Sequence, residues 1–229
     1  MRPLPAVALG LALLAAPACR RAAAPVARID PALATLLPPD TRLLAGARMD
    51  EIRKTPVWER FLAPRLSAPL ERFGSDTGLD PRKDLWEFLI ASSGSETVFL
   101  GRGKFAEGGL EPRLNRAGAR RTPYKSYTLI GDDRMAVVFV NATTALAGRP
   151  EALRSTLDKR QESRGAPPAL QERLRSLPPR SHFWAVAAGG LSNLELPNPA
   201  TGNLANLDRI RQSIESASLW LDLSSGADL

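Results

Sequence analysis

The sequence predicts an α+β fold in which an antiparallel or mixed sheet is covered by helices on one face. Short runs of alternating apolar and polar residues come in pairs separated by turn residues, as β-hairpins do. Stretches with helical spacing lie between these pairs, and the βαβ alternation of a doubly wound fold is absent. The 20 prolines among 229 residues divide the chain into short elements rather than long helices.

A duplicated stretch organises this prediction. The letters LPP occur at 37–39 and again, 140 residues later, at 177–179, and an alternating strand follows each copy. The strings LW and SSG come after the first strand and recur, in the same order, near the end of the sequence. We interpret the recurrence as an internal repeat, with chance recurrence of short strings as the alternative.

The first unit, residues 37–165, is preceded by a short helix that starts at the N-cap Asp30 and the first-turn Pro31. In the first strand we place Leu43, Ala45 and Ala47 on the buried face. The expected elements are a helix at 30–37, a strand at 42–49, proline-broken helices over 51–73, strands at 85–91 and 97–103, a helix at 106–119, strands at 123–130, 135–140 and 144–147, and a helix at 150–164.

The proline-broken region is expected to hold two or three short helices, each with a proline in its first turn. The prolines concerned are Pro56, Pro64 and Pro69. Aromatic and aliphatic residues recur there at three- and four-residue spacing, which indicates one inward face. That face is formed by Trp58, Phe61, Leu62 and Leu66.

The second unit, residues 166–229, is expected to be partial. It has a helix at 170–177, a strand at 182–189 and a strand at 219–223, with no counterpart of the later elements of the first unit. A sheet that ended there would expose a bare apolar edge, which native proteins cover or blunt. We therefore expect that the natural chain is longer, or that another subunit supplies the missing strands.

The first residues resemble an export signal. Residues 1–18 carry a charged start and an apolar run too short to span a bilayer, and they end in small residues before Cys19, the only cysteine. This order resembles a bacterial lipobox, although Pro17 departs from the usual pattern. We expect lipid attachment at Cys19, with residues 19–36 as a tether and short helix. Cleavage after Ala18 by ordinary signal peptidase is the alternative, and it would give a soluble periplasmic or secreted protein.

Three segments together resemble uncharacterised exported proteins and lipoproteins of GC-rich bacteria with duplicated α+β units. They are the LPPDT stretch at 37–41, the P-x-W step at 56–58 and the GLDPRKDL stretch at 78–85. The resemblance implies a fold and a location in the cell envelope, and it implies no reaction.

Residue sets that carry catalysis are missing from the sequence, so we expect no enzyme and no cofactor or metal. His182 is the only histidine, and no G-x-S-x-G or S-x-x-K motif is present. The GRGK string at 101–104 lacks the frame of a phosphate-binding loop, and it is interpreted as a strand end and a turn. Adjacent Asp132 and Asp133 lack the ligand spacing of a calcium loop and are interpreted as a turn.

Basic residues are concentrated between residues 101 and 181, where 16 Lys and Arg stand against 8 Asp and Glu. Tyr124 and Tyr127 lie beside the densest run. We expect this run to bind anionic lipid or envelope polymer, with an ordinary solvated face as the alternative. Nucleic acid is a poor partner for an exported protein. The run comprises Arg113, Arg116, Arg120, Arg121 and Lys125.

The function expected from these observations is that of a lipid-anchored envelope protein in the periplasm or at the outer membrane. Its role would be that of a non-enzymatic interaction or assembly module. The alternative is a periplasmic carrier that holds an apolar or lipid ligand between sheet and helices. A pocket lined by Trp58, Phe61, Phe88 and Phe99 would favour the carrier, whereas mutual packing of these rings would favour the module.

Overall fold

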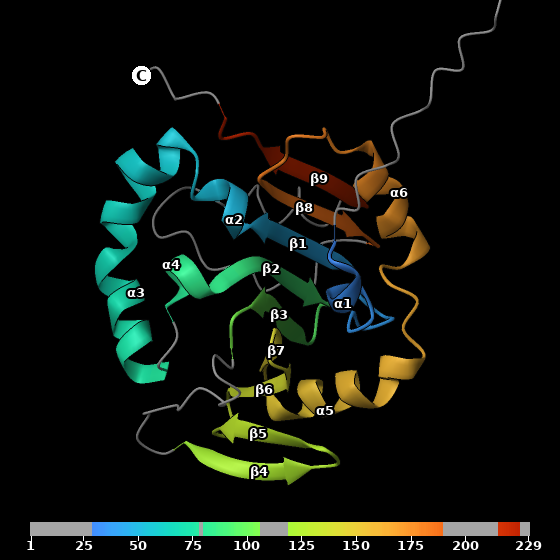
Figure 1. Ribbon diagram of the computed structural model, residues 1–229. Coiled ribbons are helices and arrows are strands. Elements are labelled where there is room, and N and C mark those ends of the chain that lie inside the picture. The colour runs from blue at the N-terminus through green and yellow to red at the C-terminus, as the bar shows by residue number, and fades with distance from the viewer. Residues whose placement is uncertain (1–28, 78–79, 106–118, 190–214, 225–229) are drawn as a thin grey trace, which may run out of the picture.

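One antiparallel sheet contains every strand of the described chain (Figure 1). The computed structural model describes residues 29–77, 80–105, 119–189 and 215–224. The sheet has nine strands in the order β4-β5-β6-β7-β3-β2-β1-β8-β9. The strands are β1 (Leu43–Arg48), β2 (Leu85–Ser92), β3 (Thr97–Gly103), β4 (Arg120–Tyr124), β5 (Tyr127–Gly131), β6 (Ala136–Asn141), β7 (Thr144–Gly148), β8 (Phe183–Ala188) and β9 (Ser216–Leu221).

Three helices cover one face of the sheet and enclose the main core. They are α1 (Pro31–Ala34), α5 (Pro150–Asp158) and α6 (Pro168–Ser176), and each begins with a proline in its first turn. Their buried leucines pack on side chains that alternate along the central strands. The largest fully buried members include Leu33, Leu44, Leu89, Leu100, Leu146, Leu153 and Leu170.

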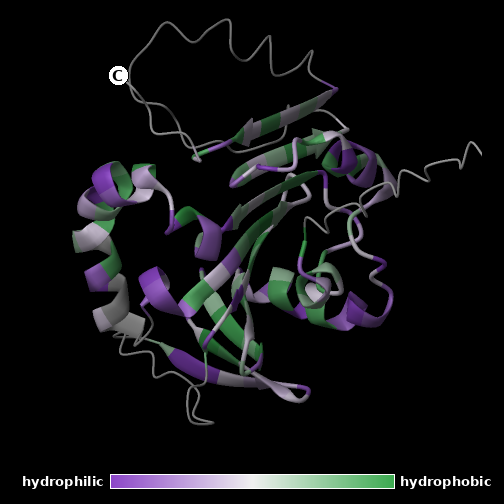
Figure 2. Cartoon of the chain, turned by 45° about the horizontal axis from the view of Figure 1, so that its top comes forward, coloured by the Kyte–Doolittle hydropathy of each residue, from purple (hydrophilic) through white to green (hydrophobic). Residues whose placement is uncertain are grey.

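A second group of helices lies on the opposite side of the sheet (Figures 1 and 2). This group comprises α2 (Met49–Ile52), the π-helical turn η1 (Trp58–Leu62), α3 (Ala63–Thr77) and α4 (Pro81–Asp84). A small core joins Ile52 and Trp58 to Ala47 of β1. The predicted α+β class with an antiparallel sheet is confirmed, but helices lie on both faces rather than on one.

The buried face of β1 is the reverse of the expected one. Leu44 is fully buried in the main core, whereas Leu43 and Ala45 on the opposite face are half-buried. Leu43, Ala45 and Ala47 were expected on the buried face because they alternate along the strand. In the structure, Leu44 is the side chain that packs in the main core under α1, α5 and α6. Ala47 is buried by the second group of helices, which gives β1 two covered faces at that end.

Several predicted boundaries differ from the structure. The strand expected at 123–130 is divided into β4 and β5 by a turn at Lys125, whose φ of 53° is in the left-handed region. Pro69 lies inside α3 rather than in a first turn, and Leu66 is exposed instead of facing inward. The helix expected at 106–119 lies almost wholly outside the described residues.

Both LPP segments precede strands, as predicted, and these strands are β1 and β8, paired side by side. The LW and SSG strings that follow the two LPP segments do not occupy equivalent positions in the sheet. Ala45 pairs with Ile90 on β2, whereas Ala185 pairs with Leu219 on β9, so Leu219 corresponds to Ile90 rather than to Leu85. The internal repeat therefore stays a prediction that depends on the first pair of segments.

Candidate ligand-binding pocket

An apolar pocket of about 180 Å³ lies on the sheet face that carries α4. It is formed by four adjacent strands, β6, β7, β3 and β2, together with α4 and the residue that follows β3. The lining residues are Pro81, Asp84, Leu85, Phe88, Phe99, Leu100, Gly101, Phe105, Val137, Phe139, Ala145, Leu146 and Ala147.

The register of the sheet sets the shape of the pocket. Phe139 on β6 pairs with Ala145 on β7, Ala145 pairs with Gly101 on β3, and Gly101 pairs with Phe88 on β2. Paired residues share a face of the sheet. The row therefore has a bulky phenylalanine at each end and two small residues, Ala145 and Gly101, in the middle. The two small residues form a floor, and the phenyl rings stand at its two sides.

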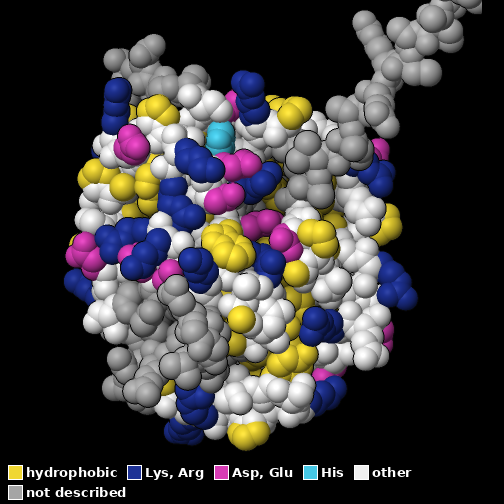
Figure 3. Space-filling model, viewed as in Figure 1, with side chains coloured by type: hydrophobic (Ala, Val, Ile, Leu, Met, Phe, Trp, Pro, Cys, Tyr) yellow, Lys and Arg dark blue, Asp and Glu magenta, His cyan; other side chains and the backbone are white. Residues whose placement is uncertain are grey.

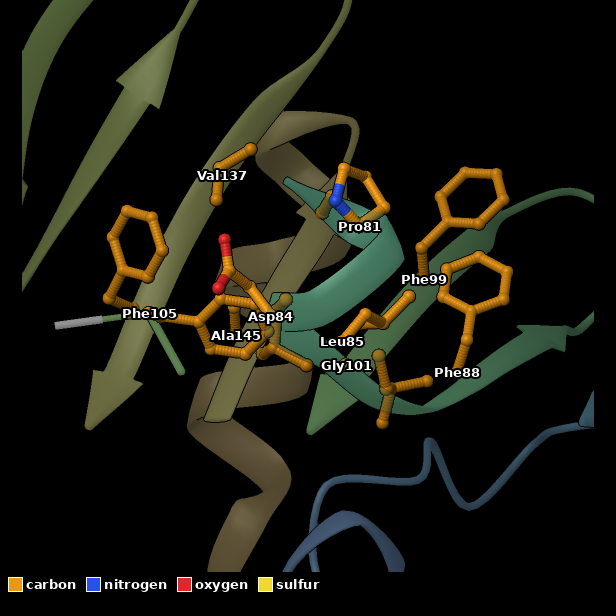
Figure 4. A pocket seen from close by; sticks show the side chains of 13 residues that line it. Pro81, Asp84, Leu85, Phe88, Phe99, Gly101, Phe105, Val137 and Ala145 are labelled. Atoms are coloured by element: carbon orange, nitrogen blue, oxygen red, sulfur yellow. The ribbon is translucent and has the colours of Figure 1, made fainter. Parts of the chain in front are cut away.

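Each side wall is a pair of aromatic rings. Phe88 and Phe99 are stacked with ring centroids 5.9 Å apart and an interplanar angle of 16°. Phe105 and Phe139 are 6.0 Å apart at 49°. In Figure 4, Phe105 lies at one side of the pocket and Phe88 with Phe99 at the other, with Ala145 between them. Such ring pairs contribute about 0.5–1.5 kcal/mol beyond their burial, so the walls are held in place.

Helix α4 closes one side of the pocket and is fixed by backbone and side-chain contacts. Asp80 caps the helix by accepting from the Arg82 N–H at 3.0 Å. The guanidinium of Arg53 donates to the carbonyls of Arg82 (2.8 Å) and Leu85 (2.9 Å). The N–H of Lys104 donates to the Asp84 carbonyl at 2.7 Å. These contacts tie the helix to both α2 and β3.

Two acidic residues belong to the start and end of α4, and Asp84 is among the residues that line the pocket. The Asp84 carboxylate accepts from the Asp80 N–H at 2.7 Å. The hydrogen bond from the Arg82 side chain lowers the pKa of the Asp80 carboxyl, and nearby Lys83 acts in the same direction. Apart from Asp84, the lining consists of apolar side chains and a glycine, which suits an apolar ligand.

The rings expected to identify the pocket are divided between two places. Phe88 and Phe99 line it, but Trp58 packs with Ile52 in the small core of the second helix group. Phe61 is half-buried and does not line the pocket. Sequence reasoning missed Phe105 and Phe139. Phe139 alternates with Val137 on its strand, a signal that marks a shared face but cannot show which strands adjoin.

The structure describes only part of the basic run that was expected to bind anionic lipid or polymer. Arg113 and Arg116 lie outside the described residues, and Arg120 and Arg121 are exposed on the edge strand β4. The Lys125 ammonium lies 2.6 Å from the Asp158 carboxylate. Figure 3 shows basic side chains spread over that view of the surface, with acidic ones among them, rather than in one patch.

Asp158 also orders the tyrosine beside the run. The Tyr124 hydroxyl donates to both Asp158 oxygens at 2.9 Å, and the Arg154 guanidinium lies 5.6 Å from the Tyr124 ring centroid. Hydrogen bonds from Lys125 and then Tyr124 lower the pKa of Asp158. Arg154, which is distant in sequence, was not expected in this cluster, and the Tyr124 ring is already occupied by a cation.

His182, Asp132 and the GRGK string, the other candidates from the sequence, each take part in the local structure of the fold. His182 is buried, and its Nδ1 accepts from the Leu223 N–H at 3.1 Å. Asp132 accepts from the N–H groups of Arg134 and Met135, as expected of a turn, and β3 ends at Gly103 as predicted for the GRGK string. Within the described ranges, no group of three or more His, Cys, Asp or Glu is placed to hold a metal ion.

Cys19 lies outside the described residues, so the predicted lipid attachment stays a prediction. None of the helices in the described part of the chain has both the length and the apolar character needed to cross a bilayer.

Comparison with known proteins gives a weak structural likeness. No protein-family model and no curated protein matches the sequence. Crystal form I of TP0453 is similar at a TM-score of 0.42 and 12% identity, over 76% of this chain and 70% of that chain. Crystal form IV of TP0453 is similar at 0.44 and 10%, over 72% and 69%. A likeness at this level carries no argument about function.

Proposed function

We propose that the protein is an exported, lipid-anchored envelope protein that holds an apolar ligand on the sheet face beside α4. The observation that carries the proposal is the pocket between the two phenylalanine pairs. Apolar surface that stays open in a folded monomer commonly marks a binding site. Anchoring at Cys19 would keep the site near the membrane, where apolar ligands are found.

The test is saturable binding of an apolar probe. The full chain, purified without detergent, is titrated calorimetrically with toluene, a single small apolar ring, and its organic extract is analysed by mass spectrometry. Saturation at one probe per chain, with displacement by the extracted material, is the expected result. Failure of every apolar probe to bind saturably would overturn the proposal.

An interaction or assembly module is a second candidate, and strand β9 favours it. The side chains of Leu219, Trp220 and Leu221 are 63%, 47% and 51% exposed. β9 pairs with β8 on one side, and no strand in the described part of the chain pairs with its other side. If this edge receives a partner strand, Leu219→Lys with Leu221→Lys will abolish concentration-dependent association measured by sedimentation velocity.

A further inference from the structure

We propose that the pocket binds one unbranched alkyl chain, methyl end first, and leaves the polar end of the ligand in solvent. This inference rests on the proposed function and adds the class of ligand. Three features carry it: the width of the floor, the volume of the pocket and the character of its lining.

The floor is wide enough for one chain. Phe88 and Phe139 stand at the ends of a row that crosses three strand spacings, which is about 14 Å between their backbones. Both side chains lie on the pocket face and take up part of this width. The space left between the two ring pairs is a narrow slot, and the small side chains of Ala145 and Ala147 on β7 line it.

The glycine is needed for this floor. A Cβ atom built at Gly101 would lie 3.3 Å from both Leu85 Cδ1 and the Phe105 ring. A longer side chain at this position would fill the space between the two walls. Leu85 and the Phe105 ring therefore already pack closely over Gly101, and the glycine is what lets these two parts of the wall approach the sheet.

The volume limits the ligand to one chain or one small ring. The pocket holds about 180 Å³. A dry cavity of about 150 Å³ binds benzene, and drug-sized ligands occupy about 300–1,000 Å³. A fused-ring lipid or a second chain would therefore not fit. The terminal part of a single alkyl chain fills a slot of this size.

The apolar lining determines which end of the ligand enters the pocket. Asp84 is the only residue among those that line the pocket with an ionisable side chain, and its carboxylate is hydrogen-bonded to the Asp80 N–H. A buried polar head group would lose its hydrogen bonds to water and find only the Asp84 carboxylate as a partner among these residues, so it stays outside. The site recognises the length of a chain and not its head group.

The experiment is calorimetric titration of the full chain with primary alcohols from hexanol to dodecanol. Each added methylene should tighten binding about fourfold until the slot is full, after which the affinity becomes constant. Alkyltrimethylammonium ions of equal chain length should bind within a few-fold of the alcohols, and cholesterol should not compete.

Two matched variants locate the site. Ala147→Leu fills the slot, whereas Ala185→Leu puts the same side chain on the same sheet face outside it. Ala147→Leu should weaken decanol binding at least tenfold, and Ala185→Leu should not change it. Thermal melting checks that both variants fold, and if Ala147→Leu does not, Val137→Phe on the neighbouring strand replaces it.

The outcomes separate the two proposals. Saturable binding of toluene without dependence on alcohol chain length, or equal competition by cholesterol, contradicts the single-chain inference and leaves an apolar site. Decanol affinity unchanged by the slot-filling variant also contradicts it. Absence of binding by every probe contradicts the proposed function itself.

Discussion

The indole ring of Trp184 on β8 lies directly over Gly46 on β1, its cross-strand partner. A Cβ atom at residue 46 would overlap Cζ2 of this ring and approach Leu89 Cδ2 to 2.8 Å. Trp184 is 3% exposed and belongs to the main core. The join between the two predicted units is thus made by a large ring that fills the space above a glycine.

Gly46→Ala is expected to destabilise the protein by about 1–3 kcal/mol, because the new methyl group overpacks the core at this join. Urea denaturation followed by circular dichroism measures the change. In a Trp184→Phe background the ring atoms that meet the methyl group are absent, so the cost of Gly46→Ala should fall. An equal cost in both backgrounds would show that the ring is not responsible.

The pairing of β1 with β8 also bears on the predicted repeat. Ala45 pairs with Ala185, and the two positions are separated by the same 140 residues as the two LPP segments. An approximate twofold axis through this pair would therefore relate the two strands. The later elements do not follow the relation, since Leu219, which takes the place corresponding to Ile90, is only 129 residues further along the chain.

Glu87 on β2 is expected to make stability fall as pH rises. Burial raises the pKa of its carboxyl, while the Asp30 N–H that donates to Glu87 Oε1 at 3.1 Å acts against this shift. Below the ordinary pKa of a glutamate, about 4.3, the group is protonated in both states. Between that pH and the raised pKa only the unfolded chain ionises, so stability is lost.

Glu87→Gln keeps the acceptor for Asp30 and removes the ionisation. The variant should therefore be more stable than the parent at pH 7, with the difference shrinking toward pH 4 in urea titrations. Glu51→Gln is the control, because Glu51 is an exposed partner of Arg48 and contributes little. A Glu87→Gln variant that is less stable at pH 7 would contradict the assignment.

The basic run is expected to bind anionic membranes in a salt-sensitive manner. Replacing Arg113, Arg116, Arg120 and Arg121 with Ser should reduce retention on vesicles that contain phosphatidylglycerol. The control removes four other arginines, Arg164, Arg173, Arg175 and Arg180, and should have a smaller effect. Equal losses in the two variants would assign the binding to net charge alone.

Asp158→Asn should strengthen the same binding. The change removes a negative charge beside the run and frees the Lys125 ammonium, which now lies 2.6 Å from the carboxylate. Because Lys125 and Asp158 are on the surface, stability should change little. The measurement is vesicle retention at two salt concentrations, and unchanged retention at low salt would rule out a role for Lys125.

Lipid attachment at Cys19 predicts a defined processing defect. Treatment of the bacterium with globomycin, which inhibits the lipoprotein signal peptidase, should cause the uncleaved precursor to accumulate. Cys19→Ser should move the protein from the membrane fraction to another fraction. Unaffected processing in both experiments would support cleavage after Ala18 by ordinary signal peptidase.

Local patterns allowed most strands to be predicted, because period-two alternation and turn residues identify hairpins such as β2–β3 and β5–β6. The choice of buried face failed at Leu44, since which side a helix covers depends on distant segments. The pocket was anticipated only through Phe88 and Phe99. Its floor at Gly101 and Ala145 comes from the pairing of β3 with β7, which are separated by three intervening strands in sequence.

Photolabelling of the pocket tests the central proposal most directly. The full chain is irradiated with a decanol that carries a diazirine at its methyl end, and the labelled peptides are identified by mass spectrometry. The label should fall on β6, β7 and β3, near Val137, Ala145 and Phe99, and excess dodecanol should prevent it. A label on β9, or one spread over the surface and insensitive to dodecanol, would contradict the account.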